Sequence, residues 1–313
     1  MEDYRQSLID FWAAIEKNNA AGERYAPVPK GWRKESHINY MADYDPWHLL
    51  NLYYPEDFDA SKGKLKTVIY IHGGGWMYGT VDISENYLAW IASQGYAVMA
   101  MNYTLLQYTD LKGIVKDIFS AMSWLEKYGE RRGFDLDNVM ITGDSAGGHL
   151  TGLVSSILKN PEIMKAYEVS PLKLNVRAIC LNCPCSETDG LYIMEGEDTE
   201  RGRGTAKAYL DMMLGEQGEK APWCGLTSLS SVMKGIKLPP MLLIGSQVES
   251  LHKQTKLLIK ALEETGQDYE PMIWKAEDGF HLEHVFNISH WEWYESLISN
   301  KRMLEYFEEH AGS

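Results

Sequence analysis

Residues 143–147 read GDSAG and place a serine among small residues, where two sequence patterns meet. An apolar run over 138–142 precedes the motif, and helical periodicity over 146–158 follows it. A strand that reverses sharply into a helix needs small residues here, because the turn is strained and the helix crosses close to the strand. Ser145 would then stand at a helix N-terminus, whose free N–H groups stabilise developing negative charge. The pattern therefore predicts a nucleophilic serine rather than a chance glycine turn.

A second motif, HGGGW at 72–76, ends another short apolar run. Three consecutive glycines let main-chain N–H groups approach an oxygen atom without obstruction by side chains. Such groups form the oxyanion hole that an acyl-transfer enzyme needs. The predicted donors are the N–H groups of Gly74, Gly75 and Ala146.

Neighbours of these two motifs are candidates for binding and for support. Trp76 follows the glycine run and Asp144 precedes the serine, so both are predicted to line a substrate pocket. His72 is expected to order the glycine loop rather than to transfer protons. Tryptophan side chains are more often buried in a core than exposed in a pocket. We expect Trp76 in the pocket because it lies beside the predicted oxyanion loop.

The segments HGGGW and GDSAGGHL (143–150) together resemble the α/β-hydrolase superfamily, in particular the hormone-sensitive-lipase-like carboxylesterases and acetyl esterases. The resemblance runs from about residue 35 to the C-terminus. It implies a Ser–acid–His triad in that chain order, a helical cap over the site, and no cofactor or metal. The implied activity is hydrolysis of short-chain, acetyl-type esters through an acyl-enzyme intermediate.

The family's acid is expected after the apolar run that ends in LLIGS (242–246). The sequence continues QVES, which puts Glu249 where the family usually has aspartate. Glutamate can fill the role, because the acid only orients the imidazole and stabilises the imidazolium. Two alternatives stay open: a solvated turn carboxylate at 249, or Asp278 as the acid, although it lies beyond the next strand.

The catalytic base is expected in the segment AEDGFHLEHVFNISH (276–290), which offers His281, His284 and His290. The stretch HVFN resembles the histidine loop of bacterial members of the family, so His284 is the predicted base. His281 is the alternative. A metal site in HLEH (281–284) is disfavoured, because the two histidines lack helical i,i+4 spacing and no third ligand is in view.

The elements that must position these residues alternate along the chain. Apolar runs typical of buried strands alternate with amphipathic helical segments from about residue 65 onward, which predicts a parallel sheet covered on both faces. Two earlier strands flank a turn at 43–46 and begin the sheet in antiparallel fashion. The expected fold is an α/β-hydrolase fold with a mostly parallel eight-stranded sheet, helices on both faces and a helical cap.

Two segments fall outside this alternation. Residues 1–34 contain an N-terminal helix that we expect to join the cap, and 35–313 form the catalytic domain. Residues 187–238 are polar and glycine-punctuated where neighbouring strands should follow one another. An insertion of this length predicts a cap or lid.

Composition limits the partners. The net charge of −14 over 313 residues argues against nucleic acid and anionic membranes, both of which need a basic face. No segment resembles a membrane span, and the acidic N-terminus does not resemble a signal peptide. Three cysteines in CLNCPC (180–185) are expected to be free core thiols. We therefore expect a cytoplasmic protein that acts on a small-molecule ester, with a homodimer left open.

Two other functions remain. The same motifs are similar to those of kynurenine formamidases, so an arylformamidase or another amidase would use the same triad on a different bond. A non-catalytic binding protein of the kind represented by the family's hormone receptors is the third interpretation. Such proteins tend to lose a triad member, whereas Ser145 and His284 are both present here.

Overall fold

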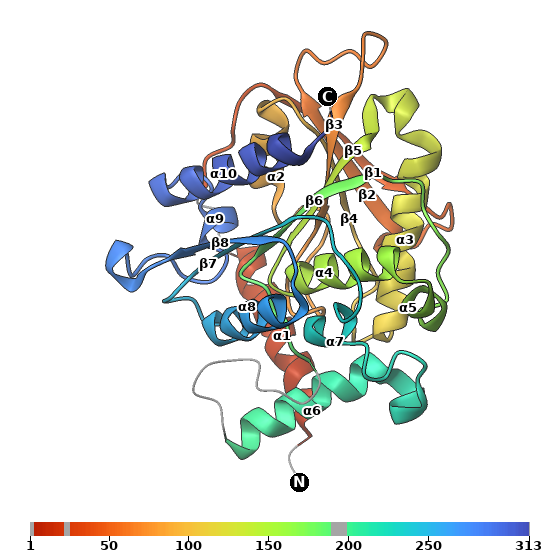
Figure 1. Cartoon of the computed structure of the whole chain (residues 1–313), viewed down its shortest axis with the longest axis vertical. Coiled ribbons are helices and arrows are strands. Elements are labelled where there is room, and N and C mark those ends of the chain that lie inside the picture. The colour runs from red at the N-terminus through yellow and green to blue at the C-terminus, as the bar shows by residue number, and fades with distance from the viewer. Residues whose placement is uncertain (1–2, 22–25, 189–198, 313) are drawn as a thin grey trace.

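A computed structural model describes residues 3–21, 26–188 and 199–312 and contains a central eight-stranded sheet (Figure 1). The strand order is β1-β2-β4-β3-β5-β6-β7-β8; β2 pairs antiparallel with both its neighbours and the remaining pairs are parallel. The predicted mostly parallel sheet is thus confirmed. The strands are β1 (Trp32–Asn39), β2 (Leu49–Pro55), β3 (Leu65–Ile71), β4 (Ala97–Met101), β5 (Phe134–Asp144), β6 (Val176–Asn182), β7 (Met241–Ser246) and β8 (Tyr269–Trp274).

Helices cover both faces of the sheet because the central strands are apolar on both sides. In β3, Val68 and Tyr70 belong to one core cluster, while Ile69 and Ile71 belong to the other. The first cluster lies under α2 (Glu85–Ser93), α9 (Phe286–Ser289) and α10 (Tyr294–His310). The second lies under α3 (Leu111–Tyr128), α4 (Ala146–Lys159), α5 (Pro161–Ala166), α7 (Leu229–Val232) and α8 (His252–Thr265). Single-turn 3₁₀ segments are η1 (Pro46–His48), η2 (Glu130–Arg132) and η4 (Ala276–Asp278), with a longer η3 (Gly215–Lys220).

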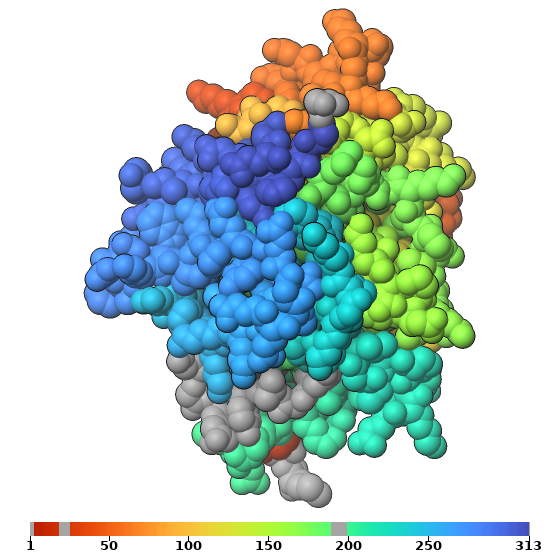
Figure 2. All heavy atoms as spheres, in the orientation of Figure 1, coloured from red at the N-terminus to blue at the C-terminus, as the bar shows by residue number. Residues whose placement is uncertain are grey.

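Two further helices, α1 (Tyr4–Ala21) and α6 (Glu200–Leu214), pack together beyond one end of the sheet (Figure 1). The ring of Tyr4 lies where a side chain on Gly204 would stand. The indole N–H of Trp12 donates a hydrogen bond to the hydroxyl of Tyr209 over 2.6 Å. In the space-filling view, atoms in the green to teal colours of α6 and the segment after it lie at the lower end of the molecule, below the blue C-terminal part (Figure 2). Residues 189–198 of the predicted insertion lie outside the described residues.

Short helices are where the structure departs from the expected elements. The four-residue α9 and the six-residue α5 were not expected, because fewer than two helical turns are too short to show helical periodicity. The last long helix begins at Tyr294 rather than near residue 291. Cys180, Cys183 and Cys185 are free and buried, as expected, and Cys224 is free and exposed. Within the described ranges, no helix is both long and apolar enough to cross a membrane.

Candidate active site

The turn between β5 and α4 carries Ser145 in a strained conformation. Its φ of 53° and ψ of −118° lie in a region that non-glycine residues rarely adopt. The helix that follows passes so close to β3 that a Cβ on Gly147 would lie 2.0 Å from the carbonyl oxygen of Ile71. A Cβ on Gly143 would lie 2.6 Å from the same oxygen. Glycine at both positions therefore lets the serine turn sit directly beside the end of β3.

The glycine run after β3 forms the loop that faces this turn. Gly74 and Gly75 have φ values of 104° and 58°, which favour glycine. His72 anchors the loop, since its Nδ1–H donates to the carbonyl oxygen of Gly73 over 2.7 Å. Tyr103 stacks on the His72 ring at 4.3 Å and donates its hydroxyl to the His72 carbonyl oxygen. Burial lowers the pKa of His72 to about 4, so the imidazole is neutral and structural.

Asp144 ties the serine turn to the glycine loop. Its Oδ1 accepts hydrogen bonds from the N–H of Gly73 at 3.0 Å and from the hydroxyl of Tyr70 at 2.5 Å. Burial raises the pKa of this carboxyl, while the Tyr70 bond and the nearby charge of His284 oppose that rise. Asp144, which precedes Ser145 in the sequence motif, therefore holds the facing glycine loop in place.

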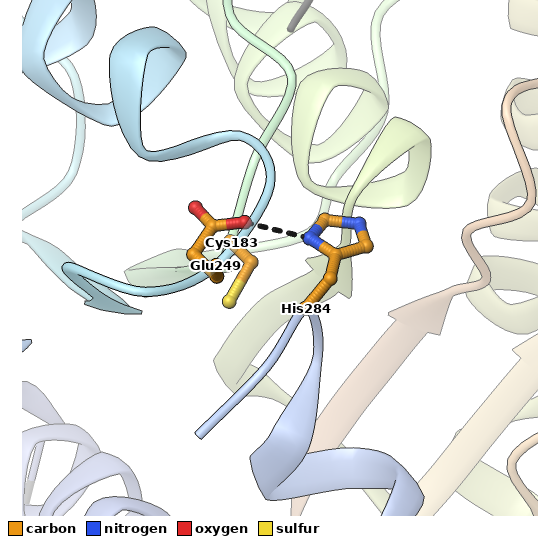
Figure 3. A group of neighbouring side chains, drawn as sticks. All are labelled: Cys183, Glu249 and His284. Carbon is orange, nitrogen blue, oxygen red and sulfur yellow. Dashed lines mark hydrogen bonds and ion pairs between the residues drawn. The ribbon is translucent and has the colours of Figure 1, made fainter. Parts of the chain in front are cut away.

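Glu249 and His284 point toward one another across the gap between the loop after β7 and the loop after β8 (Figure 3). The Nδ1 of His284 lies 2.8 Å from Oε2 of Glu249. The carboxylate is fully buried and also accepts from the N–H of Leu251 at 2.8 Å and from the hydroxyl of Thr255 at 3.4 Å. A buried carboxylate with these donors is held in one orientation. It can fix the imidazole so that Nε2 is left free to exchange a proton.

The other candidates from this part of the chain have different partners. His281 is half exposed and faces Glu295, with 3.4 Å between Nε2 and Oε2. Asp278 accepts from the N–H of Lys275 within η4. His290 stacks on Trp293 with ring centroids 4.0 Å apart. Of the three histidines, His284 is the one paired with Glu249.

A cavity of about 670 Å³ brings together the residues predicted from separate motifs. Ser145, His284, Gly74 and Asp144 all line it. Hollows of about 940 and 1100 Å³ lie elsewhere and contain none of these four residues, so chemistry rather than size identifies the site. A cavity with a nucleophile, an imidazole and a glycine loop is suited to acyl transfer.

The remaining predicted positions lie beside or behind the cavity wall. Ala146 is buried at the start of α4. Trp76 is 2% exposed and packs between His149 and Tyr209, rather than among the residues that line the cavity. A Cβ on Gly75 would lie 2.1 Å from the Trp12 ring, so the N-terminal helix covers this part of the loop.

Trp12 was not predicted as a site residue, although its helix was expected to join the cap. Trp12, Ile15 and Glu16 line the same cavity as Ser145, although they belong to the N-terminal helix. Trp12 also stacks on Tyr78 of the glycine loop with centroids 6.2 Å apart. The helical spacing of apolar residues predicts a buried face, but the partner of that face depends on how the N-terminal helix packs in the folded chain.

One group of described residues has donor atoms close enough for a metal ion: Cys183, Glu249 and His284, whose atoms lie within 4.8 Å of one another (Figure 3). Glu249 and His284 are already bonded to each other. Burial, with the charge of Glu249, raises the pKa of the Cys183 thiol well above its usual value. Because Nδ1 of His284 and Oε2 of Glu249 are already bonded to each other, these residues fit a carboxylate–imidazole pair better than a resident metal.

Two comparisons with known proteins cover most of this chain. Residues 68–282 match a family model described as the alpha/beta hydrolase fold. A crystal structure of esterase B from Lactobacillus rhamnosis with a C4-C4 SN3 tributyrin phosphonate is similar to this chain, with 38% identity and a TM-score of 0.90. That similarity covers 99% of this chain and 96% of esterase B.

Similarity to curated sequences is more local. The chain is 28% identical to ethyl acetate hydrolase of Pseudomonas putida over 47% of its own length and 46% of the relative's. It is 32% identical to arylacetamide deacetylase of Bos taurus over 39% of its length and 32% of the relative's. The aligned segments thus span less than half of these curated relatives.

Replacing Gly147 with alanine is expected to separate the serine turn from β3, because the new Cβ would collide with backbone oxygens of Ile71 and His72 at 2.0 and 2.6 Å. Misplacing Ser145 by even 1 Å should slow its reaction with a fluorophosphonate on the order of a hundredfold, as measured by intact-protein mass spectrometry. Gly245→Ala is the matched control, since its nearest contact would be a side-chain atom of Ile273 at 3.4 Å. Equal labelling rates in Gly147→Ala and wild type would contradict this account.

The neutral burial of His72 makes stability depend on pH. The unfolded chain binds a proton at an ordinary histidine pKa of 6.5, whereas the folded protein does so only at about 4. Stability should therefore fall as pH drops from about 6.5 to about 4, and His72→Asn should reduce that slope by up to about 1.4 kcal/mol per pH unit. Urea unfolding at several pH values in this window measures the slope. An unchanged slope in His72→Asn would show that another group titrates.

Proposed function

The chain belongs to the α/β-hydrolase-fold family, in its hormone-sensitive-lipase-like branch, and on that premise we propose that it is a serine carboxylesterase for short-chain acyl esters. The observation that carries the proposal is one cavity lined by Ser145 and His284, with Glu249 bonded to the far side of the imidazole. A Ser–Glu–His triad of this kind is recognised by its geometry and roles.

In the proposed acylation step, Oγ of Ser145 attacks the ester carbonyl while Nε2 of His284 accepts its proton. Glu249 keeps the proton on Nδ1 and stabilises the imidazolium. The oxyanion of the tetrahedral intermediate is proposed to bind the N–H groups of Gly74, Gly75 and Ala146. Such donors typically contribute a hundred- to thousandfold each, on the order of 3–4 kcal/mol.

The same groups complete acylation and then carry out deacylation. The imidazolium of His284 first protonates the departing alcohol, and neutral His284 then accepts a proton from water. The oxygen of that water attacks the acyl-enzyme carbonyl, and the oxyanion returns to the same donors. Collapse then breaks the bond to Oγ of Ser145 and releases the acid, while the imidazolium of His284 returns its proton to Oγ. No bond in this sequence needs a cofactor or a metal.

A short acyl group is supported by the cavity and by the similar esterase. The cavity of about 670 Å³ is lined at one side by Trp12 and Tyr78, which stack on each other beside the glycine loop. Esterase B of Lactobacillus rhamnosis was crystallised with a C4-C4 tributyrin phosphonate and is 38% identical to this chain. We propose acetyl to butyryl esters as the substrate class.

We propose a cap built from α1 of the 1–34 segment and α6 of the 187–238 insertion, over the catalytic domain expected at 35–313; its sheet begins with β1 at Trp32, so the boundary lies before residue 35. Packing of α1 against α6, and of Trp12 against the glycine loop, supports this division. The cytoplasm is the proposed compartment, which four free cysteines favour because thiols stay reduced there. The net charge of −14 supports a small ester, rather than nucleic acid, as the partner.

A second candidate is amide hydrolysis, including that of arylformamides. It is favoured by the 32% identity to a bovine arylacetamide deacetylase over 39% of this chain. The triad chemistry would be unchanged, but the leaving group would be an amine. Assay of N-formylkynurenine beside the ester panel separates the two, since an esterase should prefer p-nitrophenyl acetate by kcat/KM.

Ser145→Ala should lower kcat for p-nitrophenyl acetate by roughly ten-thousandfold or more, because no other group supplies the nucleophile. Glu249→Gln should lower it by roughly a thousand- to ten-thousandfold, because the amide can no longer hold the imidazole in the required tautomer. Steady-state kinetics on purified variants measures both effects.

The matched control for the acid is Asp278→Asn, whose carboxylate accepts from Lys275 rather than from His284. It should retain wild-type kcat within about twofold, as expected for an exposed turn residue. Activity that survives Glu249→Gln but not Asp278→Asn would reverse the assignment of the acid. A wild type inactive on acetate, butyrate and octanoate esters would overturn the esterase proposal.

Trp12→Ala should open the cavity beside the glycine loop and shift the preferred acyl length. We expect the ratio of kcat/KM for octanoate to that for acetate to rise by roughly tenfold, since each accommodated methylene contributes on the order of 0.8 kcal/mol. Phe11→Ala is the control, because Phe11 is the adjacent aromatic residue and 55% exposed. An unchanged ratio in Trp12→Ala would show that Trp12 does not limit the acyl chain.

A further inference from the structure

A buried asparagine at the end of β6 holds the serine turn from both sides. Nδ2 of Asn182 donates to the carbonyl oxygen of Gly143 at 3.1 Å, and the carbonyl oxygen of Asn182 accepts from the N–H of Ser145 at 2.9 Å. Nδ2 also donates to the hydroxyl of Thr142 at 3.1 Å. Because a carbonyl oxygen can only accept, the amide of Asn182 is fixed with its own Oδ1 facing away from the turn.

That oxygen meets a second buried asparagine, three residues after His284. Nδ2 of Asn287 donates to Oδ1 of Asn182 at 2.8 Å and to Oδ1 of Asn300 at 3.0 Å. Asn300, on α10, in turn donates its Nδ2 to the carbonyl oxygen of Asn287 at 2.8 Å. All three side chains are fully buried. This row of three side-chain amides ends on a main-chain carbonyl oxygen at each side, that of Gly143 and that of Asn287. Because these oxygens can only accept, they fix the orientation of all three amides.

The loop that carries His284 is thus held on both sides. Before it, the carbonyl oxygen of Leu282 accepts a bond from the hydroxyl of Ser246 at the end of β7. After it, Val285 adopts a left-handed conformation with φ of 56°, and Asn287 is bonded to the amides on β6 and α10. A β-branched residue in that conformation is strained and needs surrounding contacts to hold it. Asn287 supplies such a contact.

We propose that Asn287 is a positioning residue that joins the His284 loop to the Ser145 turn through Asn182, an inference that rests on the proposed triad. Asn287 touches neither substrate nor the reacting atoms. It fixes the separation between two loops that come from different strands and are 139 positions apart at Ser145 and His284. The bonds are between neutral groups inside the protein, so they hold this separation without adding charge to the site.

The test compares wild type with Asn287→Leu, which keeps the volume but removes both donors, and Asn287→Ala, which removes the side chain. Ser299→Ala is the matched control: it is also fully buried, lies next to Asn300 on α10, and bonds Trp274 and Glu295 instead. Active sites are counted with a fluorophosphonate, so that any unfolded fraction drops out of kcat for p-nitrophenyl acetate. The rate of phosphonylation of Ser145 is recorded in parallel.

We expect kcat per titrated site to fall roughly ten- to a hundredfold in both Asn287 variants, with KM within about threefold of wild type. Ser299→Ala should keep its kcat even if its melting temperature falls. Wild-type kcat in either folded Asn287 variant, or a rise in KM alone, would overturn the inference. A wild type that is phosphonylated but hydrolyses no ester would overturn the proposed function instead. The inference would then be judged by whether the Asn287 variants slow phosphonylation by the same factor.

Discussion

The architecture of the site depends on one close approach, between the N-terminus of α4 and the end of β3. No side chain fits there, since a Cβ on Gly147 or Gly143 would collide with the carbonyl oxygen of Ile71. The approach brings a serine with φ of 53° to face a loop of glycines. Without it, the strain in the Ser145 turn would have no compensating contact and the two motifs would not share a cavity.

Polar bonds inside the protein maintain that approach. Asp144 accepts from Gly73 and Tyr70 on the side of the glycine loop, while Asn182 bonds Gly143 and Ser145 on the other. Each group would be costly to bury alone and is satisfied by its partner. The turn is therefore fixed by hydrogen bonds on both flanks, which is how a strained residue persists in a stable fold.

Much of this could be predicted because the signals are local. A buried strand followed by glycines and an amphipathic helix determines the turn at Ser145 within about twenty residues, and the alternation of elements predicts the sheet. The pairing of Glu249 with His284 was harder to foresee, since three histidines lie between 281 and 290. Which one faces the carboxylate depends on the left-handed Val285 and on the bond between Ser246 and Leu282. Neither feature leaves a periodic pattern.

The position of Trp12 in the site is a second feature that a periodic sequence pattern does not predict. Its helix has an apolar face that could pack on many surfaces, and the packing of α1 against α6 brings that face onto Gly75. Trp12 donates its N–H to Tyr209 on α6, and the Tyr209 ring packs against Trp76 behind the glycine loop. Through these contacts α1 and α6 rest on the loop that supplies the proposed oxyanion donors. In the proposed enzyme, the same contacts that limit the acyl chain also keep those donors in place, so acyl selectivity and the geometry of the oxyanion site are expected to vary together.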